Sequence, residues 1–254
     1  MTKRIIWGGV YAVVLIAVFG FSSFGSELLG LFLILLLNEM ATIQKMESRF
    51  PLLSIASLGL IGASFFDWGT SQDLVVSSIL ISILVAFTLL KAEHPANEIR
   101  KALFSLAYIW LPLGYAIQQA SQKPQLILLI FVMIWASDSA AYLFGRAFGK
   151  RALAPKLSPK KTIEGFIGGI FGTILVGIIT NVYWELVPMN LAISMALSVS
   201  ICAPFGDLVA SAIKREGGVK DSGVFLPGHG GALDRLDSFI TSAPVALLIY
   251  QYLS

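Results

Sequence analysis

The chain has 254 residues, of which 56% are hydrophobic and only 13% are charged, and its mean hydropathy is +0.81. An average soluble domain carries about 25% charged residues, so this composition excludes an ordinary water-soluble globule and favours a lipid environment. The formal net charge of +3 is too small to indicate nucleic-acid binding. The single cysteine, Cys202, cannot form an internal disulfide and supplies no cysteine cluster for a metal ion.

Nine apolar windows are long enough to cross a membrane, because a bilayer-spanning helix needs about 20 mostly apolar residues. In chain order they cover residues 5–21, 27–44, 50–66, 73–90, 102–118, 124–144, 163–186, 191–213 and 236–253. The windows lack the period-2 alternation of membrane strands. The first is expected to remain a helix rather than a signal peptide, since it is long for one and residues 22–26 make a weak cleavage site. The predicted fold class is therefore all-α, a polytopic integral membrane protein with about nine transmembrane helices.

The positions of the basic residues orient these windows. With a cytoplasmic N-terminus, 17 of the 18 Lys and Arg residues fall on the cytoplasmic side, and Lys123 lies outside. Positively charged loops stay in the cytoplasm, so this asymmetry predicts a cytoplasmic N-terminus and an external C-terminus. Since no linker or fixed repeat divides the chain, we expect one membrane domain over residues 1–254. Residues 1–120 would supply N-terminal transmembrane helices, and residues 121–254 the motif-bearing helices and cytoplasmic loops.

The segment before the last window concentrates acidic, basic and glycine residues. In helical conformation, Asp207, Ser211 and Lys214 share one face, and Asp234 and Asp237 share a face at the start of the last helix. An aspartate inside a membrane is costly unless it is paired or metal-bound, so Asp207 indicates a functional site. Hard divalent cations such as Mg2+ prefer carboxylate oxygens and commonly keep substrate phosphate as a further ligand. The pattern is therefore typical of a site for a metal ion and phosphates.

Simpler interpretations stay open for some of these residues. Asp237 can cap the last helix or interact with its dipole. Lys214 and Arg215 can mark the cytoplasmic end of a helix. Glu39, in the second window, is a buried acid for which no neighbour in the sequence supplies a partner.

A second polar cluster surrounds the long cytoplasmic loop at residues 145–162. Asp138 can be a structural acid or face a substrate pocket, and Lys160 and Lys161 can be topological signals or hold phosphates. Thr162 followed by Glu164 predicts the start of a helix. The glycines that follow have the spacing of tightly packed membrane helices: Gly165, Gly168, Gly169 and Gly172.

The run from residue 211 to residue 237 resembles the signature of the phosphatidate cytidylyltransferases, also called CDP-diacylglycerol synthases. The signature elements are Ser-x-x-Lys-Arg, Lys-Asp, Pro-x-His-Gly-Gly and Asp-Arg-x-Asp. They fall on Ser211, Lys214, Arg215, Lys220, Asp221, Gly223, Leu226, Pro227, His229, Gly230, Gly231, Asp234, Arg235 and Asp237. Asp138-x-x-Ala-Tyr and residues 158–165 also resemble the family. Ala232 departs from the pattern, because the family usually has a larger aliphatic residue there.

The resemblance implies a nucleotidyltransferase that transfers the cytidylyl group of CTP to phosphatidic acid, releasing pyrophosphate and leaving CDP-diacylglycerol in the membrane. It implies Mg2+ as the cofactor, with Asp207 and Asp234 as ligands and Asp237 in support; whether a monovalent cation joins it stays open. The catalytic residues that it implies are Asp207, Lys214, Asp221, His229 and Asp234. The substrate-binding residues that it implies are Asp138, Ser158, Lys160, Lys161, Thr162, Ser211, Arg215, Lys220, Gly230, Gly231 and Arg235.

The expected reaction joins two polyanions, so positioning and charge neutralisation should supply most of the catalysis. The lipid phosphate is already an anion and needs no protein base. The resemblance also implies a homodimer, and the motifs fit the cytoplasmic face of a bacterial inner membrane, where CTP is available. Two alternatives stay open: an enzyme with another lipid acceptor, and an ion-coupled transporter, which Glu39, Asp138 and Asp207 in apolar helices would suit.

Overall fold

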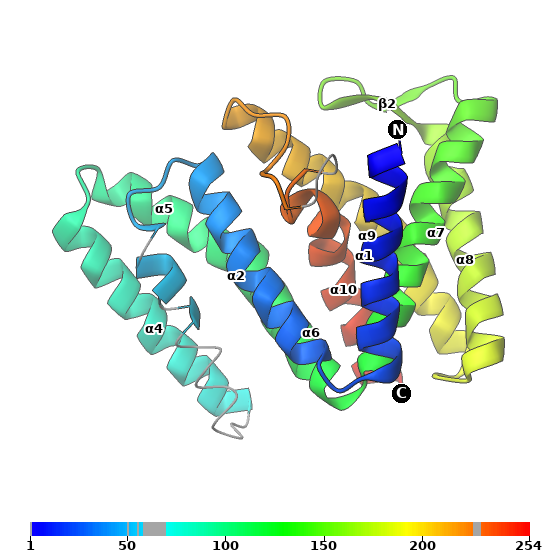
Figure 1. Cartoon of the computed structure of the whole chain (residues 1–254), viewed down its shortest axis with the longest axis horizontal. Helices are drawn as coiled ribbons and strands as arrows, with labels where there is room; N and C mark the ends of the chain where they lie inside the picture. Colours follow the sequence, from blue (N-terminus) through cyan, green and yellow to red (C-terminus); the bar gives the residue numbers. More distant parts are fainter. Residues whose placement is uncertain (1, 50, 55, 58–69, 226–229) are drawn as a thin grey trace.

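The protein is a bundle of helices with one small hairpin, seen in a computed structural model that describes residues 2–49, 51–54, 56–57, 70–225 and 230–254 (Figure 1). The helices are α1 (Thr2–Phe21), α2 (Gly25–Ile43), α4 (Thr70–Lys91), α5 (Pro95–Ser105), η1 (Leu106–Trp110), α6 (Leu111–Gln122), α7 (Pro124–Phe148), α8 (Ile163–Trp184), α9 (Met189–Glu216) and α10 (Leu233–Leu253). Strands β1 (Ala152–Ala154) and β2 (Ser158–Thr162) pair antiparallel between α7 and α8. The all-α prediction is confirmed, and the hairpin lies in a predicted loop.

Helices occupy eight of the nine predicted windows, and most of the window at 50–66 lies outside the described residues. Within the described part, four helices are long and apolar enough to cross a membrane: α2, α7, α8 and α9. Large apolar side chains such as Phe171 and Leu175 project from the exposed face of α8. Such a surface suits lipid rather than water. The total of nine spans and the orientation of the termini stay predictions.

The window at 102–118 is part of a longer helical path that runs from α5 through the π-helical turn η1 into α6. Helix α5 begins at Pro95, before the apolar window, and the polar residue Glu98 in this first part is satisfied inside the protein. Glu98 is 1% exposed. Its carboxylate accepts hydrogen bonds from the backbone N–H groups of Glu47 (2.9 Å) and Ser48 (3.2 Å), and from the Lys101 ammonium group at 2.6 Å. Hydropathy alone does not detect such a helix.

The glycines of α8 let it lie directly against α7, which confirms their predicted packing role. A Cβ atom at Gly168 would lie 2.3 Å from the Phe144 side chain, and one at Gly172 would lie 2.3 Å from the Ala140 Cβ. Helix α8 begins as predicted, since the Thr162 side chain accepts a hydrogen bond from the Gly165 N–H at 3.1 Å. This close packing fixes the hairpin beside the bundle.

The two long polar segments lie at the same end of the bundle, as the sequence predicts (Figure 1). The hairpin, the last turns of α9 and the N-terminus are at this end, and the C-terminus is at the other. Helices α9 and α10 pack against each other along their lengths, and α9 also contacts α8 and α7. The polar segments are therefore held over the packed core of α7, α8, α9 and α10.

Candidate active site

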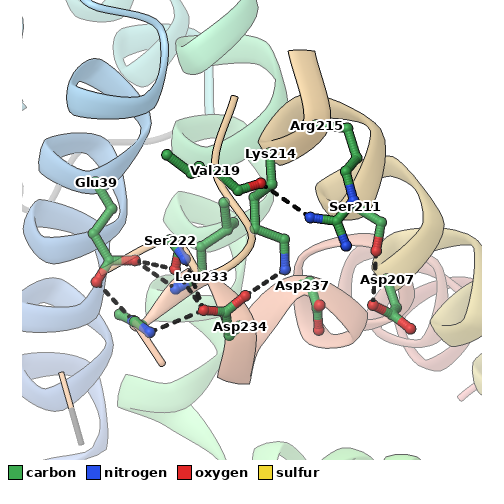
Figure 2. Close-up of polar contacts among 12 residues, drawn as sticks. Glu39, Asp207, Ser211, Lys214, Arg215, Val219, Ser222, Leu233, Asp234 and Asp237 are labelled. Atoms are coloured by element: carbon green, nitrogen blue, oxygen red, sulfur yellow. Dashed lines mark hydrogen bonds and ion pairs between the residues drawn. The ribbon is translucent and has the colours of Figure 1, made fainter. Parts of the chain in front are cut away.

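A cluster of charged side chains lies where α9 ends and α10 begins (Figure 2). Lys214, in the last turn of α9, forms an ion pair with Asp234, in the first turn of α10. Both side chains are 10% exposed. Charges this well covered need partners, because an unpaired buried charge is strongly unfavourable. The pair joins two residues that the sequence placed on separate helices.

The second oxygen of Asp234 organises the chain that leads into α10. Asp234 Oδ2 accepts hydrogen bonds from the backbone N–H groups of Ser222 (2.8 Å) and Gly231 (2.9 Å), and the Ser222 hydroxyl lies 3.0 Å away. Gly230 has φ of +81°, and a Cβ atom there would lie 2.4 Å from this oxygen. The glycine is therefore required both by its backbone conformation and by the close approach of the carboxylate.

Asp207 forms a second ion pair on α9, with Lys161 of β2. Its Oδ1 also accepts a hydrogen bond from the Ser211 hydroxyl, one helical turn away, at 3.4 Å. The predicted shared face of Asp207 and Ser211 is thus confirmed. Lys161 also donates to the backbone carbonyl of Pro204 at 3.3 Å, so the hairpin is attached to α9 at two points.

Two further acids stand close to Asp207. Asp237 is buried, and its Oδ1 accepts a hydrogen bond from the Ser238 N–H at 2.7 Å. It does not cap α10, whose N-cap residue is Ala232. Asp138 of α7 is exposed on the surface of the protein. Asp138, Asp207 and Asp237 are near enough to repel one another electrostatically, and the charges of nearby basic residues offset this repulsion: Lys161, Lys214 and Arg235.

The other predicted residues that the structure describes take structural or exposed positions. Arg215 donates a hydrogen bond to the Val219 carbonyl at 3.1 Å (Figure 2). Thr162 caps α8, and Ser158 is half-buried in β2. Exposed positions are occupied by Lys160, Lys220, Asp221 and Arg235. His229 lies outside the described residues.

The first half of the chain contributes residues that the motifs do not indicate. Glu39 of α2 accepts a hydrogen bond from the Ser222 hydroxyl at 2.8 Å. Tyr108, in the π-helical turn, donates to the Gly206 carbonyl at 3.5 Å. The Tyr11 hydroxyl of α1 is buried without a hydrogen-bond partner among the described atoms, near the charge of Asp237. In the sequence, Glu39 could be noticed as an acid within an apolar window. Nothing in the sequence pointed to Tyr11 or Tyr108 as residues near the site.

The described acids do not form a ready-made metal cage. In the part of the chain that the structure describes, no three His, Cys, Asp or Glu side chains are grouped closely enough to hold an ion together. Instead, ammonium groups neutralise Asp207 and Asp234. The site thus presents carboxylates and displaceable lysines at one end of an apolar bundle, which suits the binding of phosphate groups.

Comparison with known proteins identifies the family. The sequence profile of the cytidylyltransferase family matches residues 2–253. A protein named phosphatidate cytidylyltransferase from Staphylococcus saprophyticus is 38% identical over 181 residues, 68% of each chain. The protein of that name from Bacillus subtilis is 33% identical over 186 residues, 71% of this chain and 69% of its own. The chain therefore belongs to the cytidylyltransferase family of nucleotidyltransferases.

Proposed function

We propose that this protein transfers the cytidylyl group of CTP to phosphatidic acid. A phosphatidate oxygen forms a bond to the α-phosphorus of CTP. The bond from that phosphorus to the oxygen bridging the α- and β-phosphates breaks, and pyrophosphate leaves with that oxygen. The product, CDP-diacylglycerol, stays in the membrane. Family membership and the names of the relatives support this reaction.

The observation that carries the proposal is the pair of lysine–aspartate contacts, Lys161–Asp207 and Lys214–Asp234, at one end of an apolar bundle. Both substrates bring phosphate groups, and a lysine ammonium group binds phosphate as a compact point charge. When substrates arrive, each lysine can exchange its carboxylate for a phosphate oxygen. The aspartates are then available to a cation. This exchange neutralises both polyanions where they meet.

We further propose Mg2+ as the cofactor, with Asp207 and Asp234 as its candidate ligands and Asp237 in support. All three offer the hard carboxylate oxygens that Mg2+ prefers, but in the described part of the chain they are not grouped closely enough to hold an ion by themselves. Substrate phosphates and water would complete the ligand set in this proposal. When bound, Mg2+ supplies charge neutralisation at the reacting phosphates.

The other residues implied by the motifs act by binding and orienting in this proposal. Lys161 and Lys214 hold phosphate oxygens, and Ser211 orients Asp207. No protein base is needed, because the lipid phosphate attacks as an anion. Further residues of the motifs would guide the substrates or contact them: Asp138, Ser158, Lys160, Thr162, Arg215, Lys220, Asp221, His229, Gly230, Gly231 and Arg235. We place this site at the cytoplasmic face of a bacterial inner membrane, in a homodimer.

The test is pyrophosphate release by detergent-purified protein given CTP, Mg2+ and phosphatidic acid, with each component omitted in turn. We expect release only when all three are present, and formation of CDP-diacylglycerol in equal amount. Asp207→Asn should lose at least 100-fold in kcat, since removal of one charge-stabilising group costs about 10²–10³. Pyrophosphate release with a different lipid phosphate, but not with phosphatidic acid, would show that the acceptor is that other lipid. Silence with every acceptor would overturn the proposal.

A further inference from the structure

Glu39 connects the N-terminal half of the protein to the motif-bearing half (Figure 2). It lies near the C-terminal end of α2 and is half-buried. Its Oε1 accepts a hydrogen bond from the Ala232 N–H at 2.7 Å. Its Oε2 accepts from the Leu233 N–H at 2.9 Å and from the Ser222 hydroxyl at 2.8 Å. One carboxylate thus satisfies three donors from the chain on either side of the site.

Glu39 caps α10 from a different helix. The first N–H groups of any helix lack partners within the helix. The N-cap residue of α10, Ala232, has no side chain that can accept a hydrogen bond from them. The Glu39 carboxylate accepts from two of these groups, and its negative charge is also favoured by the helix dipole. The start of α10, and with it Asp234, is therefore fixed by a residue of α2.

The described backbone encloses the Glu39 carboxylate closely. A Cβ atom at Gly231 would lie 2.4 and 2.5 Å from the two Glu39 oxygens, and one at Gly223 would lie 2.9 Å from Oε1. Both glycines are thus at positions where a side chain would expel the carboxylate. The contact depends on the shape of the chain as well as on its hydrogen bonds.

Ser222 links Glu39 to the ion pair of Asp234 and Lys214. The Ser222 hydroxyl lies 2.8 Å from Glu39 Oε2 and 3.0 Å from Asp234 Oδ2, and Asp234 pairs with Lys214. A serine hydroxyl has one proton, so it donates to one carboxylate at a time. The backbone N–H groups of Gly231 and Ser222 satisfy Asp234, and those of Ala232 and Leu233 satisfy Glu39. Each carboxylate therefore has its own pair of backbone N–H donors, and the Ser222 hydroxyl lies between the two carboxylates.

We propose that Glu39 is a positioning residue, which holds Ser222 and the start of α10 so that Asp234 and Lys214 face the substrates. This role rests on the proposed cytidylyl transfer. Glu39 itself contacts no reacting atom in the proposal. It acts through Ser222 and through the backbone of Ala232 and Leu233. Groups that orient the residues of a metal or phosphate site typically change activity by about 10–100-fold when removed.

Three variants separate positioning from general stability. Glu39→Gln keeps the size of the side chain but replaces one carboxylate oxygen by an amide NH2 group. Both Glu39 oxygens accept hydrogen bonds, so the NH2 group would face an N–H or O–H donor that it cannot bond. Glu39→Asp keeps the charge on a shorter side chain. Glu27→Gln is the matched control, because Glu27 lies on the same helix, is exposed, and contacts only Ser26 among the contacts found for its side chain in the described chain.

Amide hydrogen exchange tests the contact without any assay of activity. In Glu39→Gln, the amides of Ala232 and Leu233 should exchange at least tenfold faster than in the wild type, while amides in the middle of α7 should not change. Glu27→Gln should match the wild type. Unchanged exchange at Ala232 and Leu233 in Glu39→Gln would overturn the inference.

Kinetics test the consequence for the site. We expect kcat to fall about 10–100-fold in Glu39→Gln, with partial recovery in Glu39→Asp and a melting temperature near that of the wild type. Faster exchange with unchanged kcat would overturn the positioning role. An equal loss of kcat in Glu27→Gln would do the same. If the wild type itself is silent with phosphatidic acid, the proposed function fails, and the exchange rates alone decide whether Glu39 holds α10.

Discussion

Lys161 contacts the Asp207 carboxylate and the Pro204 carbonyl with one ammonium group, so a residue of the hairpin is held on two successive turns of α9. The contact has two consequences. It neutralises an acid in an apolar helix, and it places beside that acid the cation that we propose binds phosphate.

Lys161→Ala should therefore reduce kcat/KM for CTP by about 30-fold, which corresponds to about 2 kcal/mol for one charge-assisted hydrogen bond. The measurement is the initial rate of pyrophosphate release at several CTP concentrations. Lys156→Ala, an exposed position in the same hairpin, is the control and should keep the wild-type rate. Equal losses in the two variants would show that general hairpin charge, rather than the contact with Asp207, determines the rate.

Lys214→Met should destabilise the protein, because it leaves Asp234 without its cation in a setting where both side chains are 10% exposed. Breaking a buried ion pair costs about 3–5 kcal/mol, and at about 2–4 °C per kcal/mol we expect the melting temperature in detergent to fall by about 6–20 °C. Adding Asp234→Asn should restore part of the loss, since no unpaired charge then remains. A double variant less stable than Lys214→Met would contradict this account.

Gly168→Ala should separate α7 from α8, because the added Cβ would lie 2.3 Å from the Phe144 side chain. Overpacking of this kind costs about 1–3 kcal/mol. Thermal unfolding in detergent measures the loss. Gly9→Ala is the control, since a Cβ there meets nothing within 4 Å, and it should leave the melting temperature unchanged or raised.

The contribution of Glu98 to stability should depend on pH. Burial raises its pKa, but the hydrogen bonds from Lys101 and Ser48 outweigh burial and hold the pKa below its ordinary value of 4.5. A carboxyl group with a lowered pKa in the folded state stabilises the fold fully above about pH 4.5, and this stabilisation is lost as the pH falls through the folded-state pKa. Lys101 forms an ion pair with Glu98, so its positive charge also favours the ionised carboxylate.

Glu98→Gln should accordingly lower the melting temperature at neutral pH, and the difference from the wild type should shrink as the solution is acidified below pH 4.5. Thermal unfolding over a pH series measures this. Glu93→Gln, an exposed acid just before α5, should show no comparable difference at any pH. A constant difference between Glu98→Gln and the wild type would exclude titration of Glu98 as its source.

Local patterns in the sequence predict much of this fold. Apolar windows become helices because lipid requires every backbone polar group to bond within its own segment. The Thr162 cap and the Asp207–Ser211 contact also depend on residues three or four positions apart, a spacing set by helix geometry. Contacts of this range can be read from spacing alone. The glycines of α8 are recognised for the same reason.

The contacts that join distant segments could not be predicted in this way. Glu39 was an acid without an assigned partner because its donors, Ser222, Ala232 and Leu233, belong to the other half of the chain. Lys161 and Asp207 likewise meet only after the hairpin packs on α9. Hydropathy also missed the first part of α5, residues 95–101, which is polar in sequence. Each of these depends on tertiary packing, which overrides local preference.

The hydrogen bonds of Glu39 to α10 also bear on the order in which the protein is made. Glu39 enters the membrane with the second described helix, long before its donors at the start of α10 are synthesised. Until then it is an acid in an apolar helix without these partners, which is costly in lipid. Arrival of the last helix removes that cost and completes the site in the same step. The same hydrogen bonds that satisfy Glu39 therefore also hold the final helix in the bundle.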